Sequence, residues 1–161
     1  MPAYTEPSDL TTLDAPTLAG ELRHAIIHAL PTLAQLSEEL ASQPRKAGGW
    51  SSKQILGHLV DSAANNLQRV VRLQIEPDLR LPGYAQAEWV AVQRYDLRPW
   101  TEVLDTWRVF NLHLAAAIEQ VQPEHLGRLW HFADSEITLG FIIEDYIAHL
   151  RHHLAQLPAA G

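Results

Sequence analysis

The chain has 161 residues, of which 47% are hydrophobic and 19% charged, so it is long and apolar enough to fold and is not a disordered segment. It contains no cysteine, which excludes disulfides, thiolate metal sites and a cysteine nucleophile. The net charge of −7 and the scattered lysine and arginine residues argue against nucleic-acid binding, which relies on a concentrated positive surface.

The first predicted helix begins at Asp14, has Pro16 just inside its start, and reaches about Gln43. An extended lead-in over residues 1–14 is expected before it. Pro31 lies within the helix, so a kink is expected there. The apolar residues recur at spacings of four and three, which is typical of a bundle seam: Leu22, Ile26, Ala29, Leu33, Leu36 and Leu40.

A second long helix is predicted over residues 51–76, because Ser51 and Gln54 form the sequence pattern of a capping box. A loop is expected over residues 77–84. A shorter helix over residues 85–95 follows it and precedes the next proline-rich boundary. The middle of the chain is therefore predicted to contain one long helix and one short one.

Pro99 opens a third long helix that reaches about Val121, and residues 122–137 are predicted to form a loop. Thr138 caps the last helix, and residues 158–161 are expected to be a tail. No stretch alternates convincingly as a strand. The predicted fold class is all-α: a four-helix bundle with a short extra helix between the second and third long helices. With no membrane-length apolar run and no secretory leader, we expect a single cytoplasmic domain over residues 1–161.

Histidine pairs four residues apart occur twice, at His149/His153 and at His24/His28. Random placement of the chain's histidines would produce about 0.5 such pairs, so spacing alone does not indicate a metal site. The helix faces differ, however. His153 falls inside the apolar arc of the last helix and His149 on its edge, whereas His24 and His28 point about 200° away from the apolar seam of theirs.

The C-terminal pair has two interpretations. Both residues could be core histidines, each hydrogen-bonded to its own neighbour, which is the more common role of a buried histidine. They could instead be two ligands of a metal, with His58 as a third. His58 lies at the margin of the apolar arc of its helix, which fits a pocket wall and a half-exposed surface equally well. His152 falls outside its arc and is expected to face solvent.

The segments that hold these histidines resemble motifs of the DinB/YfiT-like family of metalloenzymes. Residues 49–59 (GWSSKQILGHL) are similar to a motif in which tryptophan and serine precede a ligand histidine, and residues 149–157 (HLRHHLAQL) to the motif H-x-x-H-H-x-x-Q-I. Residues 83–95 are similar to a subgroup motif, G-Y-x-Q-x-x-W-V-x-x-Q-x-Y. The resemblance covers about residues 18–157, with Leu157 in place of the motif's isoleucine.

The resemblance implies a bundle in up-down-down-up order, with one mononuclear divalent metal, zinc or nickel, at one end of its core. Carried over residue by residue, the implied ligands are His58, His149 and His153, and His152 matches a position that does not bind. Some relatives look like thiol-dependent S-transferases and others like maleylpyruvate-isomerase-type enzymes. The family therefore indicates the site better than it indicates the substrate.

Three neutral imidazoles leave a metal with its full positive charge, which favours ionisation of a bound thiol or water. Because the chain has no thiol of its own, the leading hypothesis is thiol-dependent transfer, conjugation or isomerisation with a low-molecular-weight thiol as co-substrate. The alternatives are a hydrolase that uses metal-bound water and a non-catalytic, metal-binding, stress-related dimer. A small-molecule substrate and a homodimer are expected, and nucleic-acid and membrane partners are not.

Five further residues are candidates for the surroundings of the metal. Asp145 and Asp61, each one turn from an implied ligand, could orient an imidazole by accepting its second N–H, or could be ordinary surface carboxylates. Tyr84, Trp89 and Gln93 could wall a substrate pocket, although aromatic residues at helical spacing are more commonly core residues.

Overall fold

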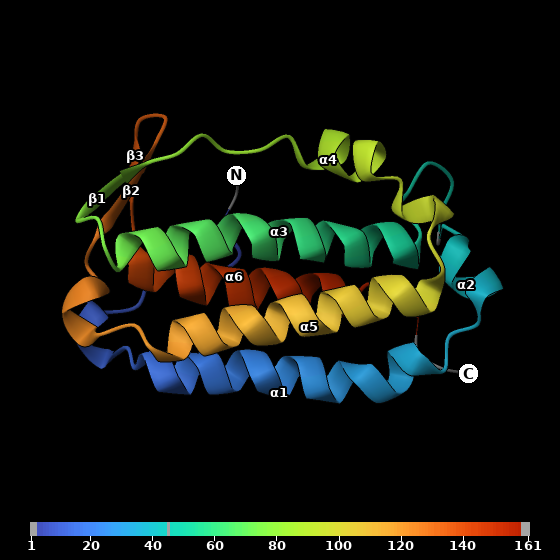
Figure 1. Ribbon diagram of the computed structural model, residues 1–161, viewed down its shortest axis with the longest axis horizontal. Helices are drawn as coiled ribbons and strands as arrows, with labels where there is room; N and C mark the ends of the chain where they lie inside the picture. The colour runs from blue at the N-terminus through green and yellow to red at the C-terminus, as the bar shows by residue number, and fades with distance from the viewer. Residues whose placement is uncertain (1–2, 45, 159–161) are drawn as a thin grey trace.

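Four long helices lie side by side in the computed structural model, which describes residues 3–44 and 46–158 (Figure 1). Apart from Pro158, the predicted tail lies outside the described residues, as do the first two residues of the predicted lead-in. The long helices are α1 (Ala15–Ala34), α3 (Ser52–Leu73), α5 (Trp100–Glu119) and α6 (Leu139–Leu154).

The direction of the helices confirms the predicted up-down-down-up order. In Figure 1, α1 and α6 run one way along the bundle, and α3 and α5 run the opposite way. The helix α5 packs against α1 and α3, and α6 packs against the same two helices. Because α3 and α5 are parallel neighbours, the chain returns along the bundle between them, through β1 (Asp78–Arg80) and α4 (Gln86–Gln93), the predicted short helix.

The bundle core is apolar, and the seam predicted in the first helix is buried through Leu36. Leu22 and Ile26 are fully buried, whereas Leu40 is 43% exposed. Burial of one aliphatic side chain contributes about 1.5–3 kcal/mol, so this packing is the main source of the fold's stability. None of the described helices is long and apolar enough to cross a membrane.

The prediction of one kinked helix up to residue 43 is wrong. The helix α1 continues through Pro31, which has no N–H to donate, and ends at Ala34, less than one turn later. A separate helix, α2 (Glu38–Ser42), begins after Ser37, whose hydroxyl accepts from the Leu40 N–H at 3.2 Å. The apolar spacing stays in phase across the break, so the sequence pattern does not reveal it.

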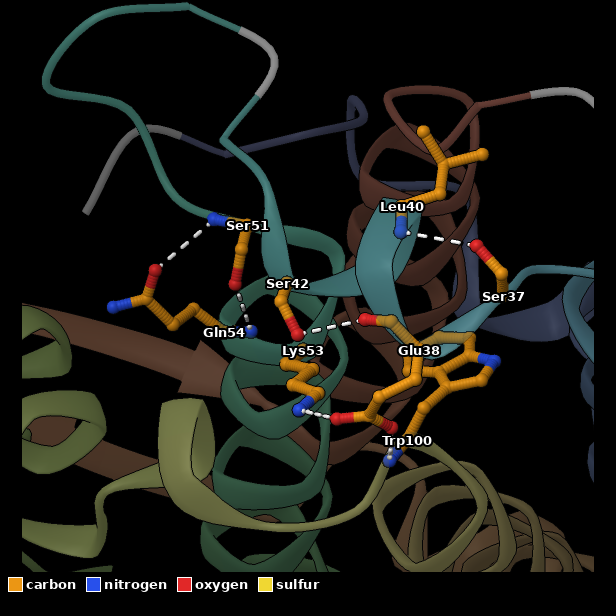
Figure 2. Close-up of polar contacts among 8 residues, drawn as sticks. All are labelled: Ser37, Glu38, Leu40, Ser42, Ser51, Lys53, Gln54 and Trp100. Carbon is orange, nitrogen blue, oxygen red and sulfur yellow. Dashed lines mark hydrogen bonds and ion pairs between the residues drawn. The ribbon is translucent and has the colours of Figure 1, made fainter.

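The Glu38 carboxylate joins α2 to the bundle (Figure 2). One of its oxygens accepts from the ammonium of the buried Lys53, in the first turn of α3. The other accepts from the Trp100 N–H at 2.7 Å, at the start of α5. A carboxylate at a helix N-terminus is favourable because it satisfies a free N–H and lies at the positive end of the helix dipole. We call these three residues the Glu38 joint.

The structure also contains a small sheet, contrary to the prediction of no strands. β1 pairs in parallel with β2 (Leu129–Phe132), which pairs antiparallel with β3 (Ser135–Thr138). These strands occupy parts of the two segments predicted as loops. Each has three or four residues, which is too short for alternation to be recognised. The sheet lies beside the C-terminal end of α3 (Figure 1).

Candidate metal site

The candidate site lies where the first half of α3 meets the second half of α6. The start of α3 is fixed by the capping box at Ser51, and that of α6 by the Thr138 hydroxyl, which accepts a backbone N–H. The two helices are antiparallel neighbours. Their packing places His58 of α3 next to His149 and His153 of α6.

The three implied ligands converge on one point. His58 Nε2 is 3.0 Å from His149 Nε2, and one ring nitrogen from each of the three histidines lies within 4.8 Å of the other two. His58 and His149 are buried and His153 is half-buried. Nitrogens this close together are all within reach of a single ion.

All three rings are neutral at pH 7. Burial, together with the neighbouring His153, lowers the pKa of His58 to about 4 and that of His149 to about 3. Burial also lowers the pKa of His153, while its hydrogen bond to Gln156 acts in the opposite direction. Each neutral imidazole keeps one unprotonated nitrogen, which is the form that binds a metal.

The hydrogen-bond partners of the rings fit a metal. His153 Nδ1 lies 3.2 Å from Gln156 Oε1, and because that oxygen only accepts, Nδ1 carries the proton and Nε2 is free to coordinate. His149 Nδ1 lies 3.5 Å from the Ser62 hydroxyl. His58 Nδ1 is buried and has no partner among the described residues. A divalent cation would satisfy the facing Nε2 atoms of His58 and His149 together.

No other histidine joins this group among the described residues. His113 is exposed on α5, and His131 pairs with two carboxylates of the sheet. The rings of His24 and His28 lie tilted against each other at a centroid distance of 3.9 Å on the exposed face of α1. His152 faces solvent, as predicted. Three protein ligands leave a coordination position open, which is typical of reactive rather than structural metal sites.

Asp145 binds the N-terminal segment and makes no hydrogen bond to His149. Its Oδ1 accepts from the backbone N–H groups of Tyr4 and Thr5. The Tyr4 ring then packs on the His149 ring at a centroid distance of 4.7 Å and on His152 at 5.2 Å. The segment predicted as an extended lead-in therefore covers the candidate site.

Asp61 is buried and is held by Gln93, the last residue of α4, and by Tyr95, not by His58. Its Oδ1 accepts from the Tyr95 hydroxyl at 2.7 Å and from the Gln93 amide. Burial raises the pKa of Asp61, and these two hydrogen bonds lower it. A Cβ atom at Gly57 would lie 2.2 Å from the Tyr95 ring, so only glycine allows this close approach. Gln93 is a partner of Asp61 and not a pocket wall.

A cavity of about 350 Å³ adjoins His149 and extends along α3 towards the sheet. Ser62, Asn66 and Arg69 of α3 line one side of it. Tyr84 also lines the cavity, which agrees with its interpretation as a pocket wall and not as a core residue. The Trp89 ring is tilted against the Tyr84 ring at a centroid distance of 5.0 Å, and Trp89 is 40% exposed. Trp89 does not line this cavity, but it lines a second pocket that also contains Arg69 and Tyr84, as the pocket-wall interpretation expected.

Residues 14–157 match the family model of the DinB superfamily, which is nearly the whole of the chain. The chain belongs to the DinB superfamily. The fold agrees with this assignment. The solved structure of YfiT from Bacillus subtilis aligns with 95% of this chain and 89% of that chain, with a TM-score of 0.83 and 18% identity. YfiT is described there as "a probable metal-dependent hydrolase with an unusual four-helix bundle topology".

Relatives of this DinB chain carry a consistent description. A protein of Bacillus licheniformis is 24% identical over 97% of this chain and 90% of its own length. A protein of Geobacillus kaustophilus is 26% identical over 86% of this chain and 83% of its own length, and one of Oceanobacillus iheyensis is 26% identical over 78% and 73%. Each of the three is named "putative metal-dependent hydrolase".

The sequence reasoning missed part of the surroundings of this DinB site. Ser62, Asn66 and Arg69 follow His58 by four, eight and eleven residues, so they lie on the same face of α3. Their spacing from His58 alone predicts that they share its face of the helix. The sequence does not predict the position of Tyr4, because this position depends on a contact with Asp145, more than 140 residues away in the chain.

Proposed function

We propose that this protein is a metal-dependent hydrolase in which His58, His149 and His153 hold one divalent metal. The observation that carries the proposal is the convergence of three neutral imidazoles, one of which, His149, lines a cavity large enough for a small molecule. The names of the relatives support the hydrolytic part of it. A set of three histidines suits zinc or nickel, and availability in the cell decides between such metals.

Thiol transfer, the leading hypothesis from the sequence, has no support among these relatives. The hydrolase alternative fits their names better and needs no thiol co-substrate. A purely structural metal is also less suited to this site, since structural zinc normally has four protein ligands and only three converge here among the described residues.

A bound divalent metal would supply a Lewis acid that polarises a substrate carbonyl and lowers the pKa of coordinated water. The residues of the chain bind, orient and shield. The Ser62 hydroxyl lies next to His149 Nδ1, and the Tyr4 ring covers the outer side of the histidines. Burial raises the pKa of Tyr84 to about 12, so its hydroxyl stays protonated and can donate to a substrate.

The proposal is tested by ester hydrolysis with the zinc- and nickel-loaded protein, using p-nitrophenyl acetate as the probe. We expect His58→Ala to lower the rate by about 100-fold or more, because it removes a ligand and the rate depends on the metal. His24→Ala, which changes an exposed histidine of α1, is the matched control and should keep full activity. Full activity of His58→Ala would show that hydrolysis does not use this site.

A further inference from the structure

Arg69 is a buried cation in the wall of the cavity. It lies on α3 about three turns beyond His58 and is 6% exposed. Its Nη1 donates to Asn66 Oδ1 at 3.0 Å, and its guanidinium lies 3.8 Å from the centroid of the Trp130 ring. Burial lowers the pKa of Arg69 to about 10, which still leaves the group charged at neutral pH.

No carboxylate compensates this charge among the described residues. Lys53, the other buried cation, forms an ion pair with Glu38, and the arginines that form ion pairs are all more exposed than Arg69. Moving a charge out of water is costly, and proteins normally pair a buried charge with an opposite one. The missing partner of Arg69 is therefore expected to come from outside the chain.

The surrounding residues hold the guanidinium in one place. The Asn66 amide that accepts from it is itself fixed, since Asn66 Nδ2 donates to the Ser62 carbonyl at 2.9 Å. The Trp130 indole beneath it is fixed by its N–H, which donates to the Leu81 carbonyl at 2.9 Å. Only Nη1 of Arg69 has an acceptor among the described residues. The other donors stay available in the planar arrangement that matches a carboxylate.

Tyr84 supplies a second donor at the same place. Its hydroxyl is buried beside the Ser62 hydroxyl and donates to no acceptor among the described residues, and Tyr84 lines the cavity together with Arg69. Arg69 and Tyr84 also line a second pocket together. A cation and an unused hydroxyl donor on one wall form a site for an anionic oxygen group.

The rest of the cavity describes the body of the ligand. Trp130, Phe132, Ile137 and Phe141 line it, and they favour an apolar or aromatic body. Asp145 contributes a carboxylate to the cavity wall. One of its oxygens accepts from two backbone N–H groups of the N-terminal segment, and Asp145 does not pair with Arg69. The cavity therefore has a positive end at Arg69 and a candidate metal end at His149.

We infer that Arg69 and Tyr84 bind a carboxylate of the substrate, so the substrate is a small apolar acyl compound with a carboxylate at the end distant from the bond that is cleaved. The identity of that bond rests on the proposed function. Its hydrolysis adds the hydroxyl of water to the acyl carbon and a proton to the leaving oxygen. The carboxylate subsite itself does not depend on turnover and can be measured by binding alone.

Binding of 4-phenylbutyrate and of its neutral amide, measured by calorimetry, tests the subsite. Because a metal can also bind carboxylates, both metal-free and zinc-loaded protein are used. We expect the acid to bind about tenfold or more tighter than the amide in both forms. Arg69→Met should remove this preference, and Tyr84→Phe should reduce it. Arg72→Met, on the same helix but paired with Glu76, is the matched control and should keep it.

Equal binding of acid and amide by metal-free wild-type protein would overturn the inference, and this comparison needs no variant. A preference that persists in folded Arg69→Met would overturn it as well.

Two esters separate the inference from the proposed function: mono-p-nitrophenyl glutarate, which carries a distal carboxylate, and p-nitrophenyl pentanoate, which does not. We expect a KM about tenfold lower for the glutarate ester, lost in Arg69→Met. Equal KM values with rapid turnover would refute the carboxylate subsite and leave the hydrolase intact. No turnover of either ester, together with tight binding of phenylbutyrate, would refute the hydrolase and leave the subsite intact.

Discussion

Lys53 and Arg69 are buried cations on the same helix, α3, but only Lys53 pairs with a carboxylate among the described residues. Lys53 is satisfied by Glu38 in the Glu38 joint, which ties α2, α3 and α5 together (Figure 2). Arg69 lines a cavity, where it contacts the Asn66 amide oxygen and the Trp130 ring and pairs with no carboxylate among the described residues. This difference indicates that the Glu38 joint has a structural role, because the charge of Lys53 is paired within the chain. The charge of Arg69 is instead expected to be paired by a bound ligand.

His149 lines the same cavity as Arg69, and His58 lies next to His149. His58 has an orphaned Nδ1, and its Nε2 faces that of His149 at 3.0 Å. Unsatisfied buried polar groups are uncommon in native proteins because each costs about 1–3 kcal/mol. Such groups at the histidine cluster and at Tyr84 in the adjoining cavity indicate where a ligand is expected to bind. Changes at the joint should therefore affect stability, and changes at the cavity should affect binding.

The largest expected effect is that of pH on the metal-free protein. His58 and His149 have folded-state pKa values below that of an unfolded histidine, about 6.5, so the unfolded chain binds more protons as the pH falls below that value. Stability is thus full above pH 6.5 and decreases towards pH 4, by up to about 1.4 kcal/mol per pH unit for each histidine.

Urea unfolding of metal-free protein at a series of pH values measures this dependence. His58→Ala should be less sensitive to pH than the wild type, whereas His24→Ala should match it. A stability that does not change between pH 6.5 and pH 4.5 would contradict the burial of neutral histidines.

Gly57→Ala should have the next largest effect, on the scaffold. The added methyl group would lie 2.2 Å from the Tyr95 ring, and backbone or ring must move to make room. We expect a loss of about 3 kcal/mol or more in the free energy of unfolding. Gly20→Ala, where a Cβ meets nothing within 4 Å, is the control and should not destabilise α1. Equal stability of the two variants would show that Tyr95 does not pack as described.

Glu38→Ala should destabilise the protein because it leaves Lys53 buried without a counter-charge and the Trp100 N–H without an acceptor. Its effect should exceed that of Asp96→Ala, which breaks an exposed ion pair with Arg94. Adding Lys53→Met to Glu38→Ala should restore part of the loss. If the double variant is no more stable than Glu38→Ala, the buried charge is not the cause.

Arg69→Met should have the smallest effect on stability. Because Arg69 is buried and pairs with no carboxylate of the described residues, we expect the free energy of unfolding to stay unchanged or rise by about 1 kcal/mol. Thermal unfolding at neutral pH provides the measurement. A loss of unfolding free energy as large as that of Glu38→Ala would show that Arg69, like Lys53, has a structural role.

The sequence predicts the long helices well because each contributes many apolar residues at regular spacing. It misses the break between α1 and α2, since the seam stays in phase there, and it misses the three strands, since each is shorter than five residues. His149 and His153 are found from their position on the apolar arc. His58 is ambiguous on the helical wheel, and the family resemblance selects it.

The unpaired state of Arg69 cannot be read from the sequence. Acidic residues are numerous in this chain, and which of them reaches which cation is decided only by tertiary packing. The same holds for Asp145, which is one turn before His149 but binds the N-terminal segment. Local spacing predicts which residues share a face, whereas the satisfaction of each polar group depends on distant segments.

Metal content shows whether three histidines from two helices hold one metal. Protein purified without a polyhistidine tag is analysed by mass spectrometry as isolated and after loading with zinc or nickel at neutral pH. We expect about one equivalent of divalent metal in the wild type and in His24→Ala, and almost none in His58→Ala. No bound metal in the loaded wild type, or an equal amount in His58→Ala, would contradict this expectation.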